Sequence, residues 1–155
     1  MFEQLIETFG INNRINIYLL TSLNEEYLKD RAGSKGRSVG EQFAHIHNVR
    51  LMWLKASAPE LMQGLNKIEK ENPVTRELLE KELKASGEAI KKLIEQSYKE
   101  RDGKVKGFKP HCAAFVGYLI SHDSHHRGQI MLALKQSGHP VDKKIQFGLW
   151  EWGVR

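Results

Sequence analysis

The segment that decides the fold reads Ser121-His122-Asp123-Ser124-His125-His126-Arg127-Gly128-Gln129. Apolar residues recur around it at steps of three and four, which predicts a helix from about Pro110 to Ser137, ended by Gly138. Its inward face would hold Phe115, Leu119, His122, His126, Ile130 and either Ala133 or Leu134. Two imidazoles on an apolar face are costly to bury unless they are hydrogen-bonded or bind a metal. The segment therefore predicts one long helix and half of a metal site.

Three more long helices are expected before it. The first runs from Phe2 to about Leu23 and is followed by a short turn at 24–28 and a polar loop at 31–37. Ser38-Val39-Gly40-Glu41 matches a capping box, so a second helix begins there and stops near Pro59. Thr75 can cap a third, amphipathic helix that reaches about Lys99. Four long helices without a strand pattern predict an all-α fold, a four-helix bundle.

The remaining segments connect or follow these helices. Residues 59–74 form a mixed connection, and 101–109 is interpreted as a surface loop because it has two glycines and many charges. The tail, 140–155, contains four large apolar side chains: Phe147, Leu149, Trp150 and Trp152. That number is unusual for a free tail, so we expect it to pack on the helices.

Length and composition indicate one globular domain, spanning 1–155. The 155 residues are 40% hydrophobic and 28% charged, and no apolar run approaches the roughly 20 residues that cross a bilayer. The N-terminal residues mix acids into the apolar positions, which is not the pattern of a secretory signal. We therefore expect a cytoplasmic protein that does not span a membrane.

The net charge of +5 does not indicate nucleic-acid binding. Basic residues are scattered and have acidic neighbours, as in Lys67-Ile68-Glu69-Lys70-Glu71. Cys112 is the single cysteine, so an internal disulfide and cysteine-rich zinc sites are excluded. We interpret it as a small core residue. Any metal must be held by histidine or carboxylate.

The histidine spacing limits the candidate ligands. His122 and His126 are four apart, which places both rings on one side of a helix about one turn from each other. The glutamate of the His-Glu-x-x-His protease motif is absent. His45 and His47 point about 200° apart, so only one of them can face the core. His45 is favoured because it shares a face with Val49, Leu51 and Met52, and His47 remains the alternative.

Other polar residues near these positions receive simpler interpretations. His125 is placed at the rim, at a dimer contact or beside the ligands, and His111 and His139 are interpreted as surface or capping side chains. For Asp123 and Glu41 we favour a side chain exposed to solvent over one that orients a ligand imidazole. Gln129 is assigned to packing or hydrogen bonding. No general base is identified, and Ser121, Asp123, His125 and Gln129 are nearby candidates.

Three motifs carry a resemblance to a known family. The capped helix 38–45, the block 122–130 and the closing Gly148-Leu149-Trp150-Glu151-Trp152-Gly153 resemble the DinB/YfiT-like family of metal-dependent enzymes, in order and over nearly the whole chain. The resemblance implies an up-down-down-up four-helix bundle, often dimeric, with a divalent metal on three histidines. By position these are His45, His122 and His126. The family includes thiol transferases that use bacillithiol or mycothiol, and a related maleylpyruvate isomerase.

The expected function follows from three neutral imidazoles, which leave open positions on a divalent ion. We expect zinc or nickel first, with iron or manganese as further candidates. Such an ion activates water or binds a thiol as thiolate. We expect a metal-dependent thiol S-transferase, ahead of a hydrolase, acting on a small molecule such as a low-molecular-weight thiol. The alternative is a metal-binding sensor or stress-response module without turnover. The sequence specifies neither the metal nor the substrate.

Overall fold

The computed structural model describes residues 1–33 and 35–155. Its four long helices are α1 (Phe2–Thr21), α2 (Val39–Ser57), α3 (Arg76–Glu100) and α4 (Cys112–Gln136). The shorter elements are α5 (Lys143–Gly148) and the 3-10 helices η1 (Glu25–Lys29) and η2 (Pro59–Met62). The described residues contain no strand, only two isolated bridges, and the expected all-α class is confirmed. None of these helices is long and apolar enough to cross a membrane.

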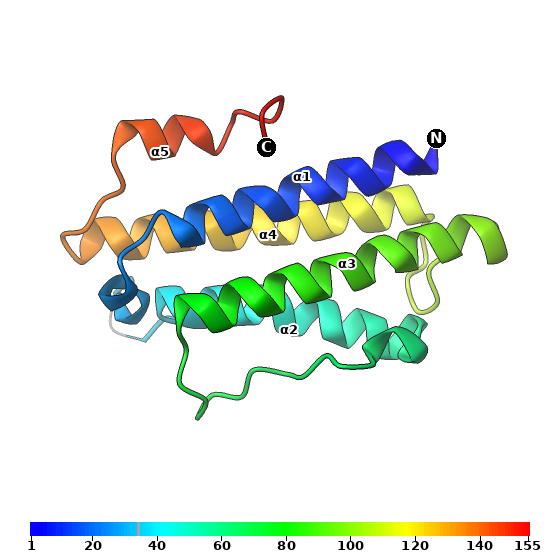
Figure 1. Ribbon diagram of the computed structural model, residues 1–155, viewed down its shortest axis with the longest axis horizontal. Coiled ribbons are helices and arrows are strands. Elements are labelled where there is room, and N and C mark those ends of the chain that lie inside the picture. The colour runs from blue at the N-terminus through cyan, green and yellow to red at the C-terminus, as the bar shows by residue number, and fades with distance from the viewer. Residues whose placement is uncertain (34) are drawn as a thin grey trace.

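The long helices lie side by side in Figure 1, where α1 and α4 run in one direction and α2 and α3 in the other. The connection over 58–75 runs along the molecule and returns the chain from the end of α2 to the start of α3 (Figure 1). α1 and α2 each pack against both α3 and α4. The two helices that carry the candidate ligands, α2 and α4, are therefore direct neighbours.

Local hydrogen bonds define where the helices begin. Ser38 Oγ accepts from the Glu41 backbone N–H at 3.1 Å, while the Ser38 N–H donates to Glu41 Oε2 at 2.6 Å, which completes the predicted capping box. Thr75 Oγ1 caps α3 as predicted by accepting from the Leu78 N–H. α4 begins at Cys112 rather than Pro110, because the Nδ1 of His111 accepts from the Ala114 N–H at 3.1 Å and makes His111 the N-cap.

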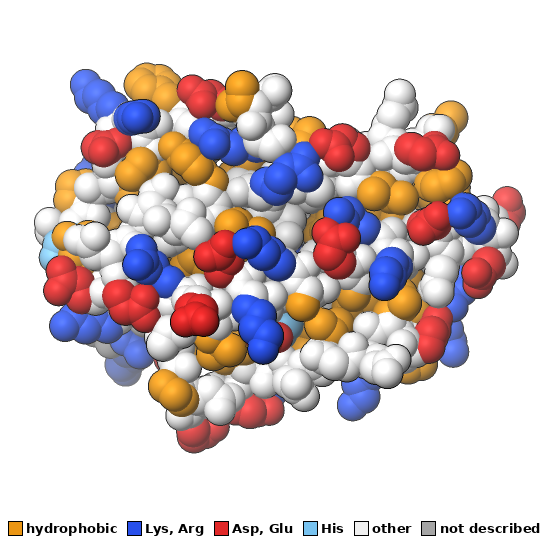
Figure 2. Space-filling model, in the orientation of Figure 1, with side chains coloured by type: hydrophobic (Ala, Val, Ile, Leu, Met, Phe, Trp, Pro, Cys, Tyr) orange, Lys and Arg blue, Asp and Glu red, His pale blue; other side chains and the backbone are white. Residues whose placement is uncertain are grey.

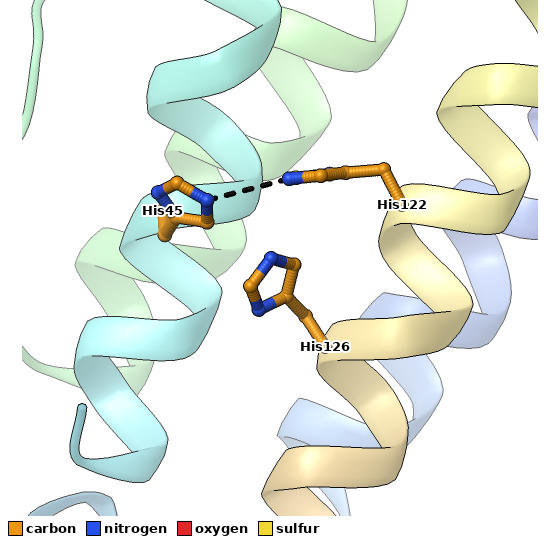
Figure 3. Close-up of side chains that lie close together, drawn as sticks. All are labelled: His45, His122 and His126. Atoms are coloured by element: carbon orange, nitrogen blue, oxygen red, sulfur yellow. Dashed lines mark hydrogen bonds between the residues drawn. The ribbon is translucent and has the colours of Figure 1, made fainter. Parts of the chain in front are cut away.

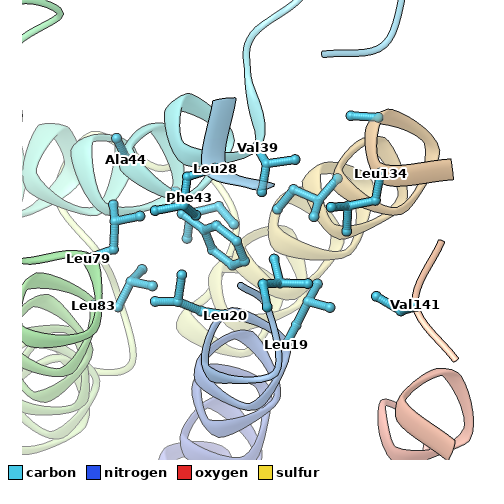
Figure 4. Packing of buried hydrophobic residues seen from close by; sticks show 14 of the residues in the cluster. Leu19, Leu20, Leu28, Val39, Phe43, Ala44, Leu79, Leu83, Leu134 and Val141 are labelled. Carbon is cyan, nitrogen blue, oxygen red and sulfur yellow. The ribbon is translucent and has the colours of Figure 1, made fainter. Parts of the chain in front are cut away.

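The core consists of two apolar clusters separated by a buried polar layer. Leu19, Phe43, Leu83 and Leu134 belong to the first cluster (Figure 4). Phe9, Leu54, Ile90 and Phe115 belong to the second. Along each long helix the two groups are separated by buried polar residues: Asn12, Asn13 and Asn16 on α1, Arg50 on α2, Ser86 on α3, and Asp123 and His126 on α4. The polar layer lies at the level of the candidate metal site.

The C-terminal tail packs only in part as expected. Val141 is buried, Ile145 and Leu149 lie against the first cluster, and Gly148 fits so closely on Tyr18 that a Cβ would collide with the Tyr18 ring. Phe147, on α5, and Trp150, just after it, nevertheless remain 68% and 80% exposed. The predicted surface loop 101–109 also departs from expectation, because Val105 is buried and Phe108 packs on Trp53.

Candidate metal centre

Three imidazoles from two helices converge at one point. His45 projects from α2, and His122 and His126 project from successive turns of α4 (Figure 3). One nitrogen from each ring lies within 4.8 Å of the others, and the Nε2 atoms of His45 and His122 are 3.3 Å apart. The side chains assigned together from the sequence are thus adjacent.

The donor set fits a divalent ion. Nitrogen ligands lie about 2.05 Å from zinc, so two nitrogens at a tetrahedral angle are separated by about 3.3 Å. The Nε2 atoms of His45 and His122 have this separation, and a ring nitrogen of His126 lies within 4.8 Å of both rings' ligand atoms. Three imidazole nitrogens are a common ligand set for zinc and related ions.

The ring of His126 is oriented by an amide. Its Nδ1 lies 2.5 Å from Gln42 Oε1, and because an amide oxygen only accepts, Nδ1 carries the proton and Nε2 keeps a free lone pair. Gln42 Nε2 donates in turn to Gln129 Oε1, and Gln129 Nε2 donates to His125 Nε2, each at 2.9 Å. Gln42 was not singled out from the sequence, although it lies one helical turn before His45 and shares its side of α2.

The ring of His122 faces a buried carboxylate. Its Nδ1 is 3.5 Å from Asp123 Oδ1, and in the described part of the chain neither atom has a hydrogen-bond partner. The expectation that Asp123 is solvated is wrong, because its side chain is 1% exposed. A hydrogen bond from Nδ1 to Asp123 would leave Nε2 for a metal, an arrangement common among metal-bound histidines.

The other Asp123 oxygen is held by the polar layer. Asp123 Oδ2 accepts from Asn12 Nδ2, Asn16 Nδ2 and Arg50 Nη2 at 2.8 to 2.9 Å. Burial alone raises the pKa of Asp123, but the Arg50 charge, with smaller effects from the His122, Arg50 and Asn16 side chains, outweighs it and lowers the pKa to about 2. The buried carboxylate is therefore ionised. Its negative charge is balanced by Arg50 instead of by solvent.

Two of the candidate ligands, His45 and His126, are neutral near pH 7. Burial is the main cause that lowers the pKa of His45 to about 4, with smaller effects from Arg37 and His122. Burial likewise lowers the pKa of His126 to about 3, assisted by the neighbouring histidines and Arg37. Neutral imidazoles offer their lone pairs to a cation without first losing a proton.

His47 lies on another side of α2 and faces away from this point. It is fully buried, its Nδ1 lies 3.1 Å from Glu82 O, and its Nε2 lies 2.9 Å from Asn66 O. These contacts fix the connection between α2 and α3. Of the two alternatives, the structure brings His45 to the α4 histidines, although Met52, expected on the same inward face, is 54% exposed.

The other residues noted in the sequence lie outside the triad of His45, His122 and His126. His125 is exposed at the rim, and His139 Nδ1 contacts Asp30 Oδ2 at 2.7 Å. Glu41 caps α2 and pairs with Arg31, so it neither orients a ligand nor stands free in solvent. Cys112 is fully buried, as expected for a core residue.

The all-helical fold and the three-histidine cluster define a class of helical proteins with a candidate metal centre. A model of the DinB family matches residues 1–145. The chain therefore belongs to the DinB family, which confirms the resemblance drawn from its motifs. No curated protein and no solved structure matches it.

Proposed function

We propose that the protein is a metal-dependent enzyme that holds one divalent ion on His45, His122 and His126. The observation that carries this proposal is the convergence of three imidazole nitrogens within 4.8 Å. The proposal includes the domain organisation that family membership implies, in which 1–155 is one domain and its long helices form an up-down-down-up four-helix bundle.

The surrounding residues would prepare the ligands. Gln42 holds the Nδ1 proton of His126, and Asp123 faces Nδ1 of His122, so both rings present Nε2. Zinc or nickel is our first assignment, with iron or manganese as further candidates, because imidazole suits several of these metals. A bound ion of this kind is a Lewis acid that acidifies a coordinated water or thiol.

For the reaction, we infer thiol S-transfer ahead of hydrolysis, with a small molecule as substrate. Family resemblance supports the transferase, as thiol transferases occur among DinB-like proteins. Cys112 is buried in the second apolar cluster, so a thiol at the metal centre would come from the substrate and not from this chain. His125, linked to the site through Gln129, is the nearest rim candidate for proton transfer.

Elemental analysis tests the ligand set. We expect about one ion per chain in the wild type and loss of metal in His45→Ala, His122→Ala and His126→Ala. His47→Ala and His125→Ala are matched controls that should keep the metal, since neither ring points to the triad. Unchanged metal in all three ligand variants would refute the site, and loss in His47→Ala with retention in His45→Ala would reassign the third ligand.

Turnover requires a separate assay. Metal-loaded protein would be tested with a panel of low-molecular-weight thiols plus chlorodinitrobenzene, and with a panel of esters. Thiol conjugation that is abolished in His122→Ala would support the transferase, and ester cleavage with the same dependence would support the hydrolase. Stoichiometric metal with no turnover in either panel would favour a sensor or stress-response module.

A further inference from the structure

A cavity of about 750 Å³ adjoins the metal centre. Its walls come from the loop before α2, the first half of α2, the connection at 67–70 and one side chain of α4. His45 lines it directly, and so do Gln42 and Gln129, the amides linked to His126. A molecule in this cavity would therefore lie against one of the three candidate metal ligands.

The walls of the cavity are fixed by the protein itself. The amide of Asn48 pairs with the backbone of Ile68 in both directions, donating to its carbonyl and accepting from its N–H at 2.9 Å. In the loop before α2, Arg31 donates to the Gly36 carbonyl and to Glu41 at the start of α2. Both flanking segments are thus tied to α2, and the cavity is formed without a ligand, as small-molecule sites usually are.

The lining carries an excess of positive charge. Five basic side chains and two acidic ones line the cavity. Arg31 pairs with Glu41 and Lys67 pairs with Glu69, whereas Lys35, Arg37 and Lys70 have no ion pair within the part of the chain that the structure describes. Over most of the face shown in Figure 2, by contrast, Lys and Arg are interspersed with Asp and Glu. Three positive charges around a concave site attract anions.

We propose that this cavity binds a small organic anion through its carboxylate or phosphate groups, with Arg37 and Lys70 as the main contacts. A guanidinium matches both groups with a pair of parallel hydrogen bonds, and an ammonium adds a point charge. The volume suits a molecule of metabolite size. That the anion is a substrate held beside His45 rests on the proposed function, but the binding itself does not.

Anion titrations test the proposal. Inorganic phosphate and succinate would be added to the protein as purified and after removal of metal by a chelator, at low ionic strength, while amide NMR shifts are followed. We expect saturable binding of at least one anion in both forms, with the largest shifts at 35–48 and 67–70, and none with uncharged succinamide. Tighter phosphate binding would indicate phosphorylated ligands, and tighter succinate binding would indicate carboxylates.

Charge-matched variants make the test specific. Arg37→Gln and Lys70→Gln should each weaken binding by about tenfold, the loss expected for one charge-assisted hydrogen bond. Lys92→Gln removes the same charge from an exposed position on α3 and should leave the affinity unchanged. The proposal is overturned if neither anion binds, if binding needs the metal, or if Lys92→Gln weakens it as much as Arg37→Gln.

The metal and the anion can be separated experimentally. Arg37→Gln should retain the wild-type metal content, since Arg37 is not one of the converging ligands. Metal bound without anion binding would refute the cavity proposal and leave the metal centre standing. Anion binding in a protein that takes up no metal would refute the metal centre and leave the cavity standing.

Discussion

Asp123 Oδ2 and Arg50 Nη2 lie 2.9 Å apart, and both side chains are 1% exposed. The pair joins α4 to α2 within the polar layer, between the two apolar clusters. Because the second oxygen of Asp123 faces His122, the same carboxylate supports the core and one wall of the candidate metal centre. Substitutions at Asp123 should therefore have two separable effects.

The first effect is on stability. Asp123→Asn leaves Arg50 buried without an opposing charge, which should lower the free energy of unfolding by about 3 kcal/mol. Arg50→Met should have an effect of similar size. The double variant Arg50→Met/Asp123→Asn should lose less than the sum of the two single variants, as measured by urea denaturation of metal-free protein. Additive losses would show that the two charges do not depend on each other.

The second effect is on metal affinity. Asp123→Asn should weaken metal binding by roughly 10- to 100-fold, the range found when the partner of a ligand histidine is removed. Asp142→Asn is the control, because it makes the same change at the N-cap of α5, away from the site. Competition with a metal-buffering chelator would measure both affinities. Unchanged affinity in folded Asp123→Asn would limit this residue to a role in the core.

The reactivity of Cys112 toward alkylating reagents is predicted to be low because the thiol is buried. Burial raises the pKa of the thiol, with a smaller opposing effect from Ser97. A raised pKa means less thiolate at any given pH, so folded protein at pH 8 should react with iodoacetamide much more slowly than protein in urea. Mass spectrometry of timed samples would measure this. Rapid, complete modification of the folded protein would contradict it.

Self-association is predicted from the tail and the family resemblance. Phe147 and Trp150 are largely exposed, and a second copy of the chain would cover apolar groups of this size. We expect a homodimer in sedimentation velocity at micromolar concentration and a shift toward monomer in Trp150→Ser. Met52→Ser, at an exposed apolar position on α2, should leave the dimer intact. A monomeric wild type would refute the prediction.

Local relationships made much of the fold predictable from sequence. The capping box at Ser38 and the Thr75 cap depend on residues three apart, and the pairing of His122 with His126 depends on one helical turn. The start of α4 was predicted at Pro110, since proline suits a first turn, but a histidine side chain caps the helix instead. Which of these neighbouring residues begins the helix depends on their backbone and side-chain conformations, and these are not evident from residue type alone.

Long-range partners explain what the sequence did not reveal. Asp123 was expected in solvent because its compensating charge, Arg50, is 73 residues away, and its other partners are on α1. One signal was available: Asn12 and Asn16 lie four apart within an apolar helix, on one side of it. The choice between His45 and His47 likewise depended on which side of α2 meets α4.

His45 and His122 are 77 positions apart in the chain, and this separation also determines when the candidate metal centre can form during synthesis. α2 leaves the ribosome early with a single candidate ligand, and both remaining imidazoles are on the last long helix. A nascent chain therefore cannot assemble the three-histidine site until α4 has emerged and packed against α2. Metal loading is thus expected only after α4 has been translated, when the packed helices compete with the cell's other metal-binding molecules for the ion.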